Sequence, residues 1–227
     1  MKHDHIIPSL FQHFSWWPLK FLMRVFCSLE IKGVENIEQL DTNTIIASNH
    51  ISELDPMLIV SCLPFFSKNL PLYFVSLEKK EYPNGWRKFF YGGTFFKLMG
   101  AYPAYVGLNN YRQALHHHIK LINEGKNVVI FPTGRIYQNN VPEKAKGGVA
   151  FLARETGTQI IPVSIKGIEH FTFNDFIQRK RKLTVVFGKP IKPEELFPNI
   201  DEIISDENKR LYEKASSILM EKISQLS

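Results

Sequence analysis

The chain has 227 residues, 44% of them hydrophobic, which suits one α/β domain with at most a small appendage. Its formal net charge of +6 favours acidic partners: anionic lipid, phosphorylated ligands, an acidic carrier protein or nucleic acid. Against nucleic acid, the basic residues are scattered and show no zinc-finger, helix-turn-helix or RNA-binding signature. Cys27 and Cys62 are too few and too isolated for a disulfide framework or a zinc site, which indicates a reducing compartment.

Residues 1–30 form an aromatic-rich segment interrupted by Pro18. Lys20 and Arg24 lie four residues apart and share a helical face, while a second, apolar face carries Leu19, Leu22, Met23 and Phe26. No uncharged run here reaches the roughly 18–20 residues that cross a bilayer, and no secretory cleavage site stands out. We therefore expect 1–30 to lie in a membrane interface, ahead of a main domain at 31–227. The alternative is an N-terminal helix packed on that domain.

A short stretch at 48–56, Ser-Asn-His-Ile-Ser-Glu-Leu-Asp-Pro, lies between two apolar runs. The run at 44–47 predicts a buried strand, and the run after the stretch predicts the start of a helix. Pro56 suits the first helical turn, which makes Asp55 the predicted N-cap. In a continuous helix His50 and Asp55 would diverge by roughly 140°, so only a turn brings them together.

In such a turn the carboxylate of Asp55 holds one imidazole nitrogen of His50 and leaves the other free as a base. That arrangement activates a hydroxyl for attack on an acyl group. The simpler interpretation is a capping aspartate beside a hydrogen-bonded loop histidine.

The rest of the chain alternates strand-like and helix-like patterns. Buried strands are predicted at 72–77, 101–105, 127–131, 159–165 and 183–187. Helices are predicted at 86–99, 109–123, 146–154 and from 205 onward, with Gly125 and Gly157 ending two of them. This alternation indicates an α/β fold with a mixed, mostly parallel sheet flanked by helices.

Three consecutive histidines, His116 to His118, lie inside the predicted helix at 109–123. Adjacent side chains on a helix diverge by about 100°, so these three cannot all ligate one metal ion. We expect no metal site there.

The predicted strand at 127–131 runs directly into Pro132-Thr133-Gly134-Arg135. A strand that ends in a glycine-containing turn with an arginine brings backbone N–H groups and a guanidinium together, which suits a phosphate or an oxyanion. The alternative is an ordinary turn whose arginine faces solvent.

Four blocks, in order, resemble one family. They are Asn49 to Asp55 with its His-x4-Asp spacing, Gly100-Ala101-Tyr102-Pro103, Phe131-Pro132-Thr133-Gly134-Arg135 and Ile160-Ile161-Pro162-Val163. Over about residues 31–190 the chain thereby resembles the PlsC-like glycerolipid acyltransferases of the lysophosphatidic-acid type. By this resemblance, 31–227 is an acyltransferase domain.

The resemblance implies transfer of a fatty acyl group from an acyl-CoA or acyl carrier protein thioester to the hydroxyl of a lyso-lipid acceptor in phospholipid biosynthesis. It implies a membrane-associated protein on the cytoplasmic face, acting without metal or other cofactor. His50 is then the general base, and Asp55 orients it. Arg135 corresponds to the family arginine that holds the acceptor's phosphate. The other expected substrate-binding residues are Asn49, Thr133, Gly134, Lys146 and Arg112.

Two positions depart from the family pattern, and both belong to the acceptor site in the family. Val106 stands where the second block usually has an arginine, and Thr133 where the third has a glutamate. These departures weaken lysophosphatidic acid and glycerol 3-phosphate as acceptors and favour a lysophospholipid with a larger headgroup, or another hydroxylated lipid. Arg112 and Lys146 are the candidate substitutes for the missing cation. Two other functions stay open: a lipid-binding membrane protein that has lost catalysis, and a thioesterase with water as the acceptor.

Overall fold

The computed structural model describes residues 6–40, 43–76, 97–105, 110–136, 144–169, 178, 181–197 and 209–226. Its strands are β1 (Glu30–Lys32), β2 (Ile45–Ser48), β3 (Leu72–Ser76), β4 (Ala101–Pro103), β5 (Asn127–Ile130), β6 (Ile160–Lys166) and β7 (Thr184–Phe187). Its helices are α1 (Ile6–Cys27), α2 (Glu35–Glu38), α3 (Asp55–Cys62), α6 (Tyr111–Ala114), α7 (His116–Asn123), α8 (Gly148–Thr156) and α10 (Lys209–Ser224), with a 3-10 helix η2 at Pro193–Leu196.

The strands form one sheet in the order β1-β7-β6-β2-β5-β3-β4. Every neighbouring pair is parallel except β6 and β7. The predicted α/β fold with a mixed, mostly parallel sheet is therefore confirmed. The central strand β2 pairs with β5 on one side and β6 on the other. The carboxyl ends of these three strands meet at one edge, which is where ligands bind in open α/β sheets.

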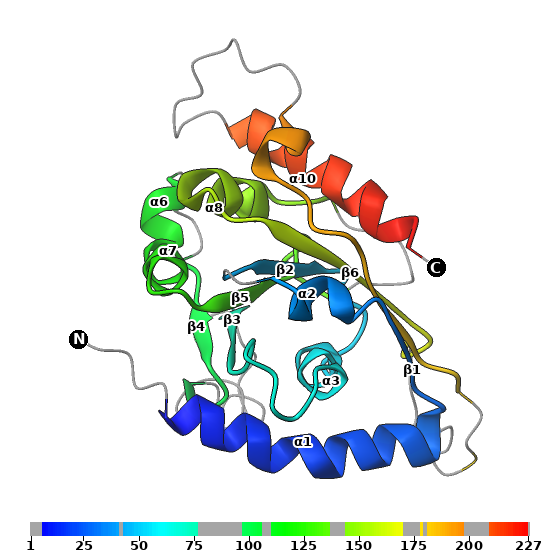
Figure 1. The fold of residues 1–227 in the computed structure, drawn as a ribbon. Coiled ribbons are helices and arrows are strands. Elements are labelled where there is room, and N and C mark those ends of the chain that lie inside the picture. Colours follow the sequence, from blue (N-terminus) through cyan, green and yellow to red (C-terminus); the bar gives the residue numbers. More distant parts are fainter. Residues whose placement is uncertain are drawn as a thin grey trace, which may run out of the picture.

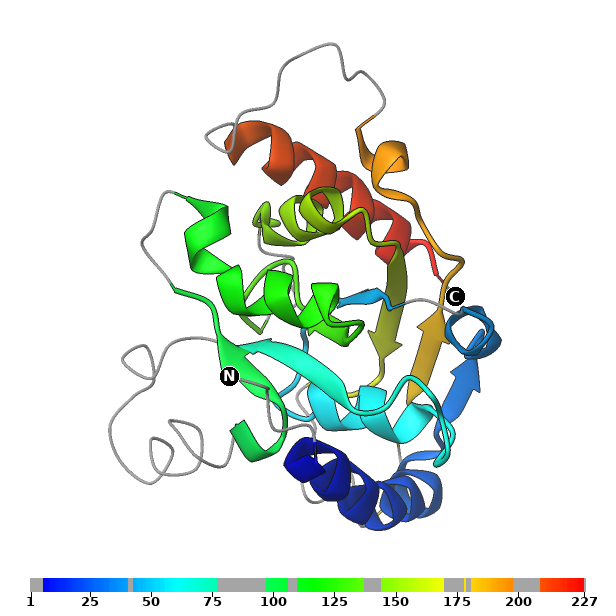
Figure 2. The ribbon, with the colours of Figure 1, turned by 60° about the vertical axis from the view of Figure 1, so that its left-hand side comes forward.

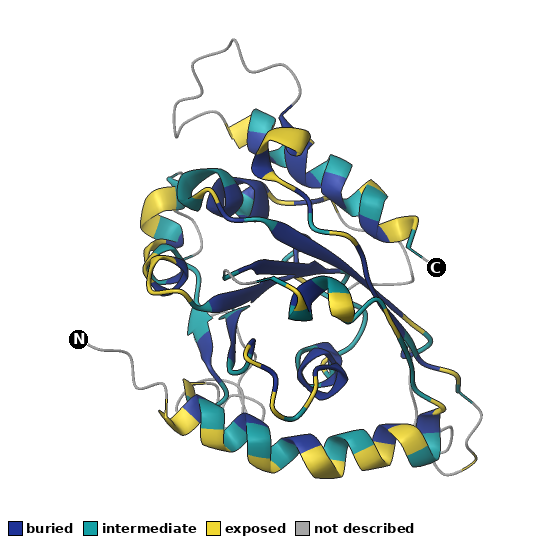
Figure 3. Ribbon diagram, in the orientation of Figure 1, coloured by how far each residue is buried: buried dark blue, intermediate teal, exposed yellow. Residues whose placement is uncertain are grey.

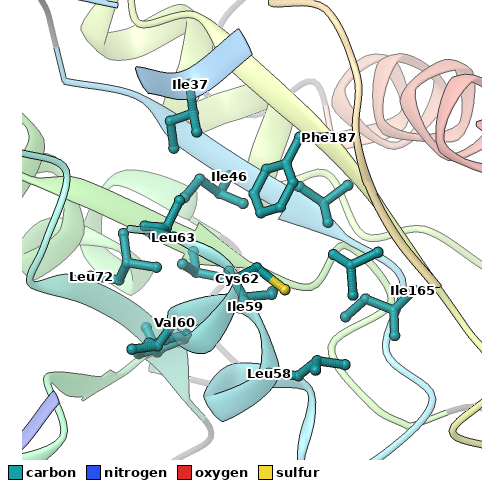
Figure 4. Packing of buried hydrophobic residues seen from close by; sticks show 14 of the residues in the cluster. Ile37, Ile46, Leu58, Ile59, Val60, Cys62, Leu63, Leu72, Ile165 and Phe187 are labelled. Atoms are coloured by element: carbon teal, nitrogen blue, oxygen red, sulfur yellow. The ribbon is translucent and has the colours of Figure 1, made fainter. Parts of the chain in front are cut away.

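Helices cover both faces of the sheet (Figures 1 and 2). Ile45 and Val128 point toward α7, α8 and α10, whereas the next residues along the same strands, Ile46 and Val129, point toward α3. Figure 4 shows Ile59 and other residues of α3 packed against Ile46 and its neighbours. Each fully buried aliphatic side chain of this kind contributes about 1.5–3 kcal/mol. The strands are buried on both faces, which explains their continuous apolar runs.

The N-terminal helix α1 lies across the outer side of α3 (Figure 1). Trp16 donates from Nε1 to the carbonyl of Leu63 at 2.9 Å, at the end of α3. Gln12 donates from Nε2 to the carbonyl of Leu72 at 2.7 Å and accepts from its N–H at 2.9 Å. The alternative prediction, a helix packed on the domain, therefore describes this face of α1. No helix in the described ranges is long and apolar enough to cross a bilayer.

Two expectations about this segment are corrected. The helix continues through Pro18, which is exposed, so the carbonyl that loses its helical partner can bond water. Met23, predicted on a free apolar face, is buried in the core cluster, and Lys20 places Nζ 4.3 Å from the centre of the Trp16 ring.

The remaining elements follow the predicted ranges closely, with some differences. The predicted helix at 109–123 is two helices, α6 and α7, which part at Leu115. Gly125 and Gly157 follow their helices with φ of 78° and 65°, as predicted. The short elements β1, α2 and η2 were not predicted. Most of the predicted helix at 86–99 lies outside the described residues.

Candidate active site

His50 stands where the chain leaves the sheet, just beyond the last β2 residue that pairs with β6. Asn49 donates from Nδ2 to the carbonyl of Ile165 and accepts at Oδ1 from its N–H, both at 2.8 Å. A side-chain amide carries the same donor and acceptor as a peptide group, so it extends the β2–β6 ladder by one step. The structure thus places the amide of Asn49 against the backbone of β6.

The predicted pair meets in the turn that follows. Nδ1 of His50 lies 2.8 Å from Oδ2 of Asp55. The same oxygen accepts from the backbone N–H groups of Ile51 at 2.7 Å and Ser52 at 2.9 Å. The loop therefore closes around one carboxylate oxygen. Asp55 is the first residue of α3 and not its N-cap, which is Leu54, because its carboxylate is turned back onto the loop.

These contacts decide which tautomer of a neutral imidazole fits beside Asp55. Asp55 is fully buried, and its hydrogen bonds offset the free-energy cost of removing the carboxylate from water. An ionised carboxylate can only accept, so Nδ1 of the neutral His50 ring carries the proton and Nε2 carries a lone pair. The His50 side chain is 17% exposed. Among the described residues, no hydrogen bond to Nε2 is present.

Phe131 covers one face of the imidazole. Its ring centre lies 4.1 Å from that of His50, with 18° between the planes. Phe131 directly follows β5, whose Ile130 pairs with Ala47 of β2, so the segments that follow β5 and β2 leave the sheet side by side. Sequence reasoning did not foresee this contact. Its only signal was that Phe131 opens the third family-like block.

The turn after Phe131 is held by its own hydrogen bonds. Gly134 donates its N–H to the carbonyl of Phe131 at 2.9 Å, and the hydroxyl of Thr133 donates to the carbonyl of Arg135 at 2.9 Å. Lys146 donates its N–H to the carbonyl of Pro132 at 2.8 Å. The N–H of Gly134 is therefore occupied within the turn, and an oxyanion site built from the backbone N–H groups near it stays a prediction. Thr133 is buried, and its hydroxyl closes the turn.

Two cations gather at this turn. Gly134 has a φ of 71°, and a Cβ added there would lie 3.0 Å from Nζ of Lys146. The Lys146 side chain thus extends over Gly134, next to Arg135, and both cationic residues are exposed. The structure brings Gly134, Arg135 and Lys146 together at a turn that begins at the residue stacked on His50.

Arg112 does not join them. Its Nη2 donates to Oε2 of Glu155 at 2.7 Å. Glu155 lies in the last turn of α8, about 10 Å along the helix axis from the end next to Lys146. Arg112 is thus paired with a carboxylate in this structure, and its role as a substitute for the missing cation stays a prediction. Val106 lies outside the described residues.

The rings of His116 and His117 lie side by side with their centres 4.0 Å apart, whereas His118 is turned into the domain. His118 is buried and donates from Nε2 to the carbonyl of Tyr102 at 3.2 Å, whereas His116 is exposed. Within the described ranges, no group of three or more histidine, cysteine, aspartate or glutamate side chains is placed to hold a metal ion.

Comparison with known proteins places this site in a family. A family model described as "Acyltransferase" matches residues 28–166. The 1-acyl-sn-glycerol-3-phosphate acyltransferase LPAT1 of Arabidopsis thaliana chloroplasts is 25% identical over 195 residues, 84% of this chain and 49% of that protein. A probable 1-acyl-sn-glycerol-3-phosphate acyltransferase of Mycoplasma genitalium is 28% identical over 209 residues, 78% of this chain and 72% of that protein. The chain thus spans about half the length of the plant relatives it matches.

The fold is shared with a solved structure. The crystal structure of the 1-acyl-sn-glycerophosphate (LPA) acyltransferase PlsC from Thermotoga maritima matches with a TM-score of 0.56. The match covers 90% of this chain and 75% of that chain at 20% sequence identity, so it shows the fold alone. The family model covers more than half of the residues and includes His50, Asp55 and the turn at 131–135. The chain therefore belongs to the acyltransferase family and is PlsC-like in its sequence blocks and fold.

Proposed function

We propose that this protein is an O-acyltransferase of phospholipid biosynthesis. It moves a fatty acyl group from a CoA or acyl carrier protein thioester to the hydroxyl of a glycerol-phosphate-type or lysophospholipid acceptor. The observation that carries the proposal is the 2.8 Å contact between Nδ1 of His50 and Oδ2 of Asp55, with Nε2 left as the base. The family match and the names of the relatives support the glycerolipid class of acceptor.

The reaction follows from that geometry. Nε2 of His50 removes the proton from the acceptor hydroxyl as its oxygen attacks the thioester carbonyl. The tetrahedral intermediate collapses, the carbon–sulfur bond breaks, and the imidazolium returns the proton to the leaving sulfur. The products are an ester and a free thiol. Asp55 stays ionised and stabilises the imidazolium, as in triads built on the same pair of side chains.

The anionic end of the acceptor is assigned to Arg135 and Lys146. Both are exposed cations on a turn that starts at Phe131, which contacts His50. Charge-assisted hydrogen bonds from a guanidinium and an ammonium suit a phosphate group. Lys146 then supplies a second cation, and the hydroxyl of Thr133 closes the turn where the family usually has a glutamate.

A membrane surface is assigned to the outward face of α1, where Figure 3 shows exposed residues along the helix. Five large apolar side chains at helical spacing, each 63–83% exposed, form a stripe, namely Ile6, Leu10, Phe14, Trp17 and Phe21. Phe66, 91% exposed, lies beside the stripe through Phe65, which contacts Trp17. The helix has no acidic residue, and Arg24 is exposed near its end. This stripe suits a helix lying in the interface of a cytoplasmic, anionic membrane face.

The test is an assay of thiol release from acyl-CoA and from acyl carrier protein. The acceptors are lysophosphatidic acid, glycerol 3-phosphate, and lysophospholipids with choline or ethanolamine headgroups. We expect His50-dependent release that requires an acceptor, with the new ester formed in equal amount. Release at an equal rate without acceptor would indicate a thioesterase. Lipid binding without any thiol release would indicate a protein that has lost catalysis. Either result would overturn the proposal.

A further inference from the structure

Phe131 is the least expected member of the site. Its ring and the His50 imidazole are nearly parallel, 18° apart, with their centres 4.1 Å from each other. Phe131 is 8% exposed and belongs to the core cluster that also contains Leu58 and Ile59 of α3. Its ring is therefore fixed by the core on one side and presents its face to the imidazole on the other.

The stacking supplies a constraint that Asp55 cannot. The imidazole is bonded to Cβ through Cγ and held by the carboxylate at the neighbouring atom, Nδ1, so the ring can still tilt about the line through these two atoms. A flat side chain against the face of the ring blocks this rotation. Together, the edge contact and the face contact fix the direction of the lone pair on Nε2. We propose that Phe131 is a positioning residue for His50, and that it acts through its aromatic face and not merely by filling space.

The ring has a second effect during the reaction. When Nε2 takes a proton, the imidazole becomes a cation beside the negative face of the phenyl quadrupole, and this contact is attractive. Phe131 also excludes water from that face, which strengthens the electrostatic interaction between His50 and Asp55. An aliphatic side chain of similar size would still exclude water but would supply neither the flat contact nor the quadrupole.

This inference rests on the proposed function, and its test has one arm that needs no substrate. Histidine-labelled protein gives NMR signals for the ring protons of His50, assigned by their loss in His50→Gln. Protons stacked on a phenyl face are shifted upfield by its ring current. We compare the wild type with Phe131→Leu, which removes the ring, and with Phe131→Tyr, which keeps it. Phe151→Leu is the matched control, because Phe151 is a buried, stacked ring on the opposite face of the sheet.

In Phe131→Leu we expect the His50 signals to lose the upfield shift and kcat to fall by about 2- to 10-fold, with KM for both substrates unchanged. Phe131→Tyr should keep most of the upfield shift and most of kcat, and Phe151→Leu should change neither quantity. The proposal is overturned if Phe131→Leu keeps the wild-type kcat or the wild-type His50 signals. It is also overturned if Phe131→Tyr or Phe151→Leu loses as much kcat as Phe131→Leu.

Two further outcomes are also decisive. If Phe131→Leu does not fold, the wild-type spectrum decides, because His50 signals without an upfield shift would overturn the stacking itself. If the wild type transfers no acyl group, the proposed function fails, and the NMR comparison still tests whether Phe131 fixes the ring.

Discussion

Asn49 and Ile165, 116 residues apart in the chain, exchange two hydrogen bonds of 2.8 Å between a side-chain amide and a backbone. They fix the point at which the backbone leaves β2, one residue before His50. A side chain predicted to bind substrate is thus engaged in holding the loop that carries His50 on β6. We therefore assign Asn49 to positioning the His50 loop.

For Asn49→Ala we expect the free energy of unfolding to fall by about 1–3 kcal/mol, because two partly buried hydrogen bonds are lost. We expect kcat to fall as well, since the loop that carries His50 loses its attachment to β6. Urea unfolding and steady-state kinetics measure the two effects. Asn36→Ala is the control, because Asn36 donates from Nδ2 to the carbonyl of Phe187 on β7 at 2.9 Å, a comparable side-chain to backbone bond that does not hold the loop after β2. A rise in KM with stability and kcat unchanged would restore a substrate-binding role for Asn49.

Much of the fold was predictable because buried parallel strands appear in the sequence as continuous apolar runs. β2 and β5 are examples, and both lie within their predicted ranges or within one residue of them. β1 was missed because its three residues, Glu30 to Lys32, include two charged ones and are extended only through pairing with β7. The break at Leu115 was missed because the apolar spacing continues through it.

The site was predictable only where it is local in sequence. His50 and Asp55 lie in one loop, so their spacing and the flanking strand and helix were sufficient. The contacts of His50 with Phe131 and of Asn49 with Ile165 depend on the order β6-β2-β5, which no local pattern reveals. The engagement of Arg112 with Glu155 is likewise a long-range contact.

The outward face of α1 can be tested without disturbing its inward face. Phe14→Ser and Phe21→Ser remove exposed side chains, so we expect unchanged urea unfolding. Binding to anionic vesicles should weaken by roughly tenfold for each, because a buried aromatic side chain contributes about 1.5–3 kcal/mol. Trp16→Phe should lower the free energy of unfolding, because it loses the bond to Leu63. It should leave vesicle binding unchanged, because the stripe stays intact. Wild-type cosedimentation of both serine variants would remove the stripe from membrane contact. Deleting the whole helix is a poorer test, because it removes Trp16 and Met23 from the core.

The two neighbouring lysines before α8 give a matched pair. Lys146 extends over Gly134, whereas Lys144 pairs with Glu213 at 2.7 Å. We expect Lys146→Ala to raise KM for a phosphate-bearing acceptor by about tenfold, as the loss of one charge-assisted hydrogen bond implies. KM for the thioester should stay constant, and Lys144→Ala should leave both values unchanged. Equal KM values in the wild type and both variants would exclude Lys146 from the acceptor site.

His118 makes stability depend on pH. Burial lowers the pKa of His118 to about 4 from its ordinary value of 6.5. Between these values the unfolded chain binds the proton more readily, so stability is fully present above pH 6.5 and decreases as the pH falls toward 4. The difference corresponds to roughly 3 kcal/mol. We expect His118→Leu to be less stable than the wild type at pH 7.5, where it lacks the bond to Tyr102, and to lose less stability on transfer to pH 5. If the free energies of unfolding of the wild type and His118→Leu change equally between pH 7.5 and pH 5, His118 is not the source of the pH dependence.

The most direct test of the account is the rate of acyl transfer by His50→Ala, measured as thiol release with the acceptor that the wild type prefers. The control is His116→Ala, which removes an exposed histidine far along the chain. Because a general base contributes about 10²–10⁴-fold, we predict a loss of at least about 10²-fold in a variant that still folds, and a wild-type rate in the control. Transfer by His50→Ala at close to the wild-type rate would contradict the account.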